Sequence, residues 1–180
     1  MKYDPFKHHR HSIRLKGYDY SQAGAYFVTC VTHNRECLFG EIVVGEMRLN
    51  EYGQIVAEEW FKTAQVRSNV ELDEFVVMPN HLHGILVIVD DSTTVGANRR
   101  FAPTPRAPTP NSIGAVMMQF KSIVTKCINT MRDSQGAPVW QRNYYEHIVR
   151  NERELEHIRA YIVGNPTRWN VDKENPGNKE

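Results

Sequence analysis

The 180-residue sequence contains few cysteines and no long apolar run. Its three cysteines, Cys30, Cys37 and Cys127, are odd in number, widely spaced and form no C-x-x-C pair. This pattern argues against a disulfide framework and against a cysteine zinc site. No apolar stretch approaches the roughly 20 residues that span a bilayer, and no basic segment followed by an apolar run opens the chain. We therefore expect an unsecreted cytoplasmic protein that does not contact a membrane.

The sequence also lacks an excess of charge of either sign, because 22 basic residues stand against 21 acidic ones. The net charge of +1 excludes the polycation expected of a non-specific nucleic-acid coat. Residues 1–22 are locally basic, however, and interleave Arg10, Arg14 and Lys16 with histidines and tyrosines. That mixture suits phosphate binding and base stacking, and it is equally typical of a solvated tail.

Length and composition predict one packed domain with extensions. Hydrophobic residues make up 41% of the chain and charged residues 24%, which are ordinary values for a globular protein. We expect a basic extension over residues 1–22, a domain over 23–170 and a C-terminal tail over 171–180. Within the domain, residues 90–111 are rich in proline, threonine and arginine, which predicts a flexible insertion.

The periodicity of apolar residues predicts an α+β fold. Runs rich in β-branched and aromatic residues predict strands over 25–32, 71–79, 81–89 and 139–150, and a short hairpin over 36–50. Apolar stripes predict helices over 51–65, 112–132 and 151–165, with Asn50, Ser112 and Asn151 at their N-termini. Apart from the hairpin, the first six elements follow the order of a ferredoxin-like antiparallel sheet with helices mainly on one face, and a C-terminal helix follows them.

The segment MPNHLHGILVIV contains the first candidate site. Alternate residues of a strand share a face, so His81 and His83 point the same way while Leu82 turns into the core. Two adjacent imidazoles can chelate a divalent metal ion. A histidine pair of this kind is also common as a hydrogen-bonded surface feature, so the spacing alone leaves both interpretations open.

The last predicted helix contains the second candidate site. His157, Tyr161 and Asn165 are spaced by four residues and share a helical face. A tyrosine hydroxyl attacks phosphorus poorly unless a metal orients the phosphate and neutralises its charge. A divalent metal held by the histidine pair would do so. Alternatively, Tyr161 belongs to the apolar stripe and Asn165 ends the helix before proline.

Tyr144 and Tyr145 are rival nucleophiles in the strand predicted over 139–150. Adjacent residues of a strand face opposite sides of the sheet, so we expect at most one of them to look toward the histidines. Aromatic residues in strands more often pack against the sheet. The polar partner four residues later favours Tyr161, and its preference as nucleophile rests mainly on the family resemblance that follows.

Four segments, in this order, resemble the HUH single-strand endonuclease superfamily. They are MPNHLHGILV, FKSIVTKCIN, WQRNYYEHIVR and YIVGNPTRW. The resemblance extends from about Tyr26 to Trp169 and is to the REP-associated tyrosine transposases, which are related to small insertion-sequence transposases. REP denotes the repetitive extragenic palindrome, a DNA hairpin.

The resemblance implies a ferredoxin-like fold in which His81 and His83 hold Mg²⁺ or Mn²⁺. Tyr161 would then form a covalent 5′-phosphotyrosine link to single-stranded DNA and leave a free 3′-hydroxyl that later rejoins strands. In the insertion-sequence relatives, a glutamine four residues after the tyrosine completes the metal shell. Asn165 stands at that position here, which implies a third ligand with a shorter side chain.

The substrate implied by the resemblance is a DNA hairpin with a single-stranded flank, bound by a monomer or a homodimer. Lys121 and Arg142, in the second and third matching segments, are expected to contact this DNA together with the basic residues of the amino-terminal extension.

Two other functions fit the same residues. A non-catalytic nucleic-acid-binding module of ferredoxin-like fold would bind without metal and without Tyr161. A metal-dependent hydrolase would use water as nucleophile and would cleave DNA without forming a covalent adduct.

Overall fold

A computed structural model describes residues 17–90 and 108–178. Four strands form an antiparallel sheet in the order β4-β5-β1-β6. The strands are β1 (Gly24–Val31), β4 (Val70–Met78), β5 (His81–Ile88) and β6 (Tyr145–Val149). This order is that of the β-α-β-β-α-β ferredoxin-like sheet. The predicted α+β ferredoxin-like class is confirmed.

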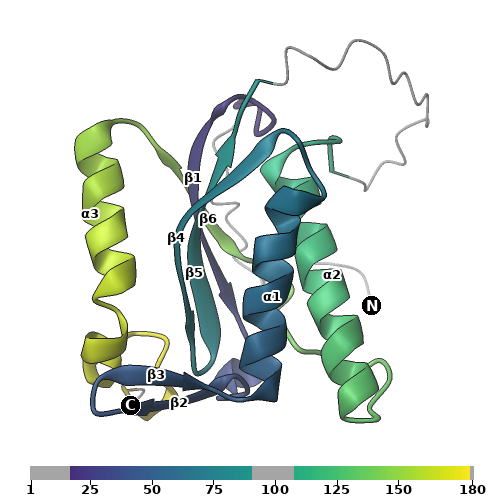
Figure 1. Cartoon of the computed structure of the whole chain (residues 1–180), viewed down its shortest axis with the longest axis vertical. Coiled ribbons are helices and arrows are strands. Elements are labelled where there is room, and N and C mark those ends of the chain that lie inside the picture. The colour runs from purple at the N-terminus through teal and green to yellow at the C-terminus, as the bar shows by residue number, and fades with distance from the viewer. Residues whose placement is uncertain (1–16, 91–107, 179–180) are drawn as a thin grey trace, which may run out of the picture.

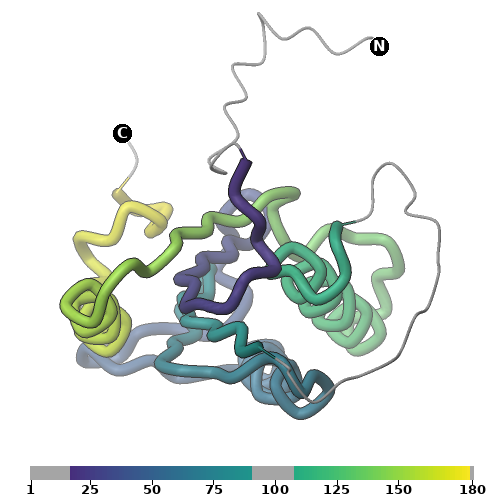
Figure 2. Tube along the Cα trace, turned by 90° about the horizontal axis from the view of Figure 1, so that it is seen from above, coloured from purple at the N-terminus to yellow at the C-terminus, as the bar shows by residue number. Residues whose placement is uncertain are grey.

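Three helices cover the two faces of the sheet. Helices α1 (Glu51–Gln65) and α2 (Ile113–Met131) pack on one face, and α3 (Glu152–Val163) lies on the other (Figure 1; Figure 2). The predicted N-caps are confirmed, because the side chains of Asn50, Ser112 and Asn151 accept hydrogen bonds from backbone N–H groups three residues later.

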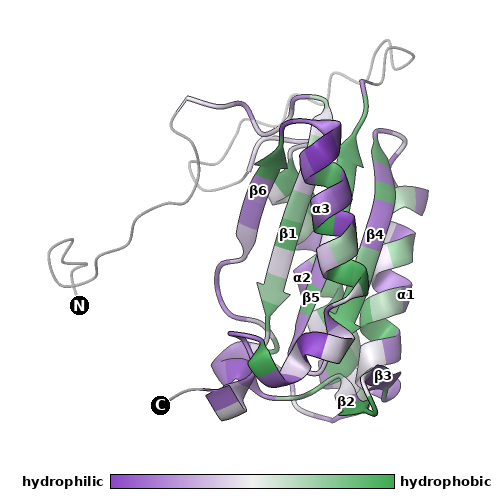
Figure 3. Cartoon of the chain, turned by 90° about the vertical axis from the view of Figure 1, so that its left-hand side faces the viewer, coloured by the Kyte–Doolittle hydropathy of each residue, from purple (hydrophilic) through white to green (hydrophobic). Residues whose placement is uncertain are grey.

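The sheet separates a large core from a small one. The large core lies under α1 and α2 and includes Leu82, Trp60 and Phe120, whereas the small core lies under α3 around Phe27 and Ile85. Figure 3 views the molecule from the α3 side and shows hydrophobic strands β1 and β5 behind a helix whose first turns are hydrophilic. Because neighbouring residues of β5 face opposite sides, the position of Leu82 in the large core turns the histidines toward α3.

Gly84 permits the close packing of α1 on β5. A Cβ atom at this position would lie 2.4 Å from Cζ2 of Trp60, which is fully buried. The absence of a side chain therefore lets the indole ring lie directly against the strand. The strand that carries His81 and His83 is thus supported from behind by a large rigid side chain.

Two regions depart from the predicted elements. The strand expected over 139–150 is reduced to β6, and Trp140 instead forms an isolated bridge with Thr32. Three of the intervening carbonyls accept hydrogen bonds from Lys121 rather than from a neighbouring strand. After α3, two short 3-10 helices that were not predicted, Pro166–Val171 and Pro176–Asn178, continue the chain.

The predicted hairpin is present as β2 (Gly40–Val43) and β3 (Glu46–Leu49), which pair around a turn at Gly45. Most of the insertion expected over 90–111 lies outside the described residues. In the described part of the chain, no helix is long and apolar enough to cross a membrane.

Candidate functional site

The two histidines lie side by side at the start of β5. His81 is fully buried and His83 is 2% exposed, and their ring centroids are 4.5 Å apart. Both rings face α3, as the strand alternation predicts. Such burial of two imidazoles is costly unless their nitrogen atoms find partners.

The Nδ1 atom of each histidine has a protein partner. Nδ1 of His81 lies 2.8 Å from Oδ1 of Asn80, whose amide group donates to two backbone carbonyls. The Asn80 oxygen must therefore accept from His81, which leaves Nε2 of that ring as an unprotonated acceptor. Nδ1 of His83 lies 2.8 Å from Oγ1 of Thr29, its cross-strand neighbour. Partners of this kind orient histidines that bind metal ions.

Asp172 joins the histidines from the end of the chain. Its Oδ2 atom lies 4.0 Å from Nε2 of His81, and one ligand atom from each of His81, His83 and Asp172 lies within 4.8 Å of the other two. The backbone N–H of Glu174 donates to Oδ1 of Asp172 and fixes the carboxylate. This residue was not predicted, because it falls in the segment interpreted as a tail and has no spacing relation to the histidines.

Asn165 is also part of the site. It follows the end of α3 but keeps helical backbone angles (φ −65°, ψ −42°), so it stays on the side of Tyr161. Its side chain is 1% exposed, and its Oδ1 atom has no hydrogen-bond partner among the described residues. His157, which was expected on the same face, is exposed and borders a different cavity.

The donor set fits a divalent cation. Like Oδ1 of Asn165, Nε2 of His81 is a buried atom that has no hydrogen-bond partner among the described residues. Burial of a polar atom without a partner is destabilising, so both atoms are available to a ligand that would satisfy them. Two imidazole nitrogens, one carboxylate and one amide oxygen are ligands that divalent metals accept. The cluster of His81, His83, Asp172 and Asn165, hereafter the metal cluster, can therefore bind a metal ion.

The electrostatics keep both histidines neutral. Burial lowers the pKa of His81 to about 4, although the nearby carboxylate of Asp172 opposes this shift. Burial, followed by the neighbouring His81, lowers the pKa of His83 well below its ordinary value. Only the neutral form of histidine binds a metal, so both side chains are ready to act as ligands at neutral pH.

Tyr161 projects from α3 onto the metal cluster. Its hydroxyl oxygen lies 3.2 Å from Nε2 of His83, and its ring makes edge contacts with the rings of Phe27 and His83. Burial and then the carboxylate of Asp172 raise the pKa of Tyr161, whereas a hydrogen bond with the Asn165 side chain lowers it. The phenol is therefore protonated at neutral pH.

An ion pair fixes the helix that carries Tyr161. The guanidinium of Arg159 binds the carboxylate of Asp73 on β4, with Nε 2.9 Å from Oδ1 and NH2 2.5 Å from Oδ2. A forked pair of this kind restricts both distance and orientation. Ile158 and Ile162 add apolar contacts from the same helix.

A cavity of about 680 Å³ opens beside Tyr161 and reaches His83, Asn165 and Asp172. The cationic side chains of Arg168 and Lys173 border it. Tyr144 and Tyr145 also border it, because β6 begins only at Tyr145 and strand alternation does not apply to its neighbour. The cavity thus brings a nucleophile, metal-binding groups and positive charge together.

The predicted DNA contacts lie in different places. Arg10, Arg14 and Lys16 are outside the described residues. Nζ of Lys121 donates to the carbonyl oxygens of residues 141, 142 and 143, at 2.7, 3.3 and 3.3 Å. Arg142 is exposed at the edge of the sheet.

Comparison with known proteins identifies relatives but no matching family model. The chain is 41% identical over 175 residues to a Haemophilus influenzae protein named "Uncharacterized protein", and the match covers 96% of each chain. It is 21% identical over 154 residues to a protein of the same organism named "Putative REP-associated tyrosine transposase", with 83% of this chain and 74% of the relative covered.

A solved structure of a REP-associated tyrosine transposase bound to a REP hairpin has the same fold. Its TM-score with this chain is 0.59 at 18% identity, and the match covers 89% of this chain and 77% of the other.

Proposed function

We propose that this chain cuts and rejoins single-stranded DNA. The chain belongs to the same family as the 41% identical Haemophilus influenzae protein, and it is related to the REP-associated tyrosine transposases. The observation that supports this most strongly is the contact between Tyr161 and His83. A potential nucleophile lies 3.2 Å from a group of the metal cluster, at the wall of a cavity bordered by positive charge.

The proposed reaction is a transesterification. The phenol of Tyr161 loses its proton as its oxygen attacks the scissile phosphorus, the bond from phosphorus to the 3′ oxygen breaks, and that oxygen takes up one proton, so no net proton is released. The products are a 5′-phosphotyrosine and a free 3′-hydroxyl. Attack of a 3′-hydroxyl on the phosphotyrosine rejoins DNA and returns the phenol, so the energy of the phosphodiester bond is conserved and no ATP is needed.

The residues of the chain position the reactants. Before a metal binds, Nε2 of His83 lies 3.2 Å from the hydroxyl oxygen of Tyr161 and keeps this oxygen at the cavity wall. Arg168 and Lys173 offer positive charge to the phosphates of a bound strand. The ion pair of Arg159 with Asp73 holds α3 at the distance from the sheet that this arrangement needs.

The metal cluster is proposed to hold Mg²⁺ or Mn²⁺ through His81, His83, Asp172 and Asn165. When bound, such an ion supplies charge neutralisation at the scissile phosphate. The proposed substrate is a hairpin with a single-stranded flank, which is supported by the hairpin bound to the related transposase of the same fold.

The test is the formation of a covalent adduct. Hairpin oligonucleotides drawn from repeats near the gene are incubated with the protein and Mn²⁺ and then separated under denaturing conditions. We expect a protein–DNA adduct that is lost with EDTA, with Tyr161→Phe and with His83→Ala. Tyr145→Phe is the matched control, because it removes a second hydroxyl from the same cavity and should leave the adduct intact.

The other outcomes favour the alternatives. Cleavage without an adduct would indicate a hydrolase that uses water. Binding that needs neither metal nor Tyr161, without cleavage, would indicate a nucleic-acid-binding module.

A further inference from the structure

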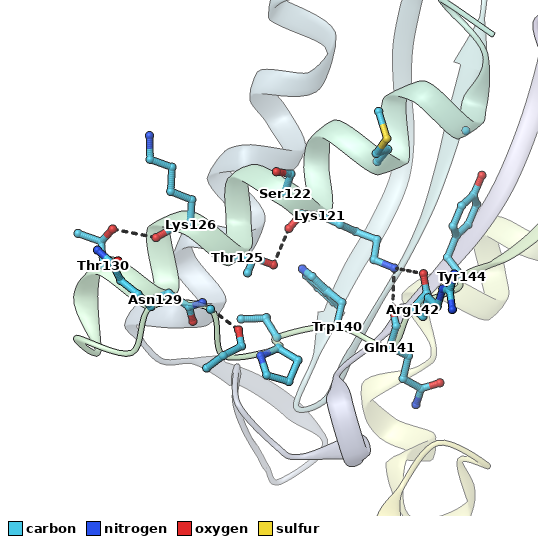
Figure 4. A pocket seen from close by; sticks show the side chains of 17 residues that line it. Lys121, Ser122, Thr125, Lys126, Asn129, Thr130, Trp140, Gln141, Arg142 and Tyr144 are labelled. Carbon is cyan, nitrogen blue, oxygen red and sulfur yellow. Dashed lines mark hydrogen bonds between the residues drawn. The ribbon is translucent and has the colours of Figure 1, made fainter. Parts of the chain in front are cut away.

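A second cavity lies on the opposite side of the sheet from α3. It has a volume of about 730 Å³ and runs between α2 and the segment 135–142 (Figure 4). Lys121, Lys126 and Arg142 line it, and no aspartate or glutamate does. Among the described residues, Lys126 and Arg142 are exposed and form no ion pair with a carboxylate. We call this cavity the α2 groove.

The α2 groove also offers aromatic and hydrogen-bonding groups. Tyr144 and Trp140 line it together with the hydroxyl of Thr125, and Figure 4 shows these side chains around the opening. The Trp140 side chain is 6% exposed, and its Nε1–H group has no partner among the described residues. Cationic side chains beside aromatic rings are the features with which proteins bind single-stranded nucleic acids.

The α2 groove adjoins the cavity beside Tyr161. Gln141 and Tyr144 line both cavities, so the two cavities meet at the segment 140–144. Lys121 holds this segment in place through its hydrogen bonds to three successive carbonyl oxygens, and the N–H of Gln141 donates to Val31 on β1. A strand that crosses this fixed segment passes from the α2 groove toward Tyr161.

We propose that the α2 groove binds unpaired nucleotides of the DNA strand next to the phosphate that Tyr161 attacks. Arg142 and Lys126 contact the phosphates, and Tyr144 provides a stacking surface for a base. This proposal rests on the proposed function, since it assigns a further part of the same substrate. A protein partner fits the groove less well, because a cationic lining without carboxylates complements a polyanion.

The first experiment measures binding without chemistry. A fluorescein-labelled twelve-nucleotide oligodeoxythymidylate is titrated with the full chain carrying Tyr161→Phe, in EDTA, at several salt concentrations. Adding Arg142→Gln and Lys126→Gln should weaken binding several-fold and reduce the slope of log K against log salt by about 1.4, since each lost phosphate contact in a single strand reduces it by about 0.7.

The matched control carries Arg150→Gln and Arg153→Gln, which remove the same charge beside α3. We expect its affinity and slope to stay close to those of the parent. If both pairs of substitutions weaken binding equally, the effect is that of net charge and the groove proposal is wrong. A blunt hairpin without unpaired nucleotides should bind both variants alike.

The second experiment locates the strand. Each thymidine of the oligonucleotide is replaced in turn by 5-bromodeoxyuridine, the complex is irradiated, and tryptic peptides are mapped by mass spectrometry. Crosslinks to Trp140 or Tyr144 are expected, in the peptides 133–142 and 143–150. Crosslinks confined to residues outside the α2 groove would overturn the proposal.

The two proposals fail separately. Adduct formation at Tyr161 together with unchanged affinity of the groove variants would refute the groove and leave the transesterase intact. Groove-dependent binding without any adduct in Mn²⁺ would refute the transesterase and leave the groove as a nucleic-acid-binding site.

Discussion

Replacing Asp172 by asparagine tests the metal cluster at the residue that sequence patterns did not reveal. The amide is nearly isosteric and can still accept the hydrogen bond from the N–H of Glu174. Without metal, the change removes a buried negative charge whose field raises the pKa of Tyr161. We therefore expect the free energy of unfolding in EDTA to equal or slightly exceed that of the wild type.

With metal, the effect should reverse. A metal that binds only the folded state at 100 times its dissociation constant stabilises it by about 2.7 kcal/mol, which corresponds to a rise in Tm of about 5–11 °C for a domain of this size. If loss of the carboxylate weakens binding about 100-fold, the stabilisation at the same Mn²⁺ concentration falls to about 0.4 kcal/mol, or about 1–2 °C.

Thermal unfolding in EDTA and across a Mn²⁺ titration measures both effects. Asp133→Asn is the matched control, because Asp133 is exposed and lies away from the metal cluster. A variant at Asp172 that responds to Mn²⁺ as strongly as the wild type would refute its role as a ligand. A variant that loses the same stability in EDTA as in Mn²⁺ would indicate a structural role instead.

Two further predictions concern stability. Gly84→Ala should lower the free energy of unfolding by about 1–3 kcal/mol through the clash with Trp60, and in urea denaturation the cost should be smaller on a Trp60→Leu background; equal costs on both backgrounds would contradict this packing. The lowered pKa values of His81 and His83 mean that the unfolded chain binds protons that the folded chain does not between about pH 6.5 and 4. In EDTA, the free energy of unfolding should be highest above pH 6.5 and should fall on acidification by up to about 1.4 kcal/mol per pH unit for each histidine. A free energy of unfolding that does not change with pH would show that these imidazoles are not buried.

The parts of the fold that depend on local patterns were predictable. The apolar alternation of β5 predicts which face of the sheet carries the histidines, and the three N-caps were read from single side chains followed by helical stripes. The strand before α3 was overestimated, because Trp140 and its neighbours have strand-like composition. Their actual course depends on hydrogen bonds to Lys121, which is 20 residues away from Gln141 in sequence.

The site was predictable only in part, for a related reason. His81 and His83 share a strand and Tyr161 and Asn165 share the end of a helix, so sequence spacing relates the members of each pair. Asp172 reaches the metal cluster only through the 3-10 turn after Pro166. No periodicity connects a residue in such a turn to a distant strand, and its partners become visible only in three dimensions.

The contact between Tyr161 and His83 also limits how the site can work. Nε2 of an imidazole can bind one hydrogen-bond partner or one metal ion, and in this structure Nε2 of His83 forms a hydrogen bond with the hydroxyl of Tyr161. Ligation of a metal through the same nitrogen excludes this hydrogen bond, whereas the bond of Nδ1 to Thr29 is compatible with both. The hydroxyl of Tyr161 is therefore bound to the same nitrogen of His83 that a metal ion would occupy. The hydroxyl of Tyr161 then keeps its hydrogen bond with the Asn165 side chain, and a substrate phosphate in the adjoining cavity is a candidate for its second partner.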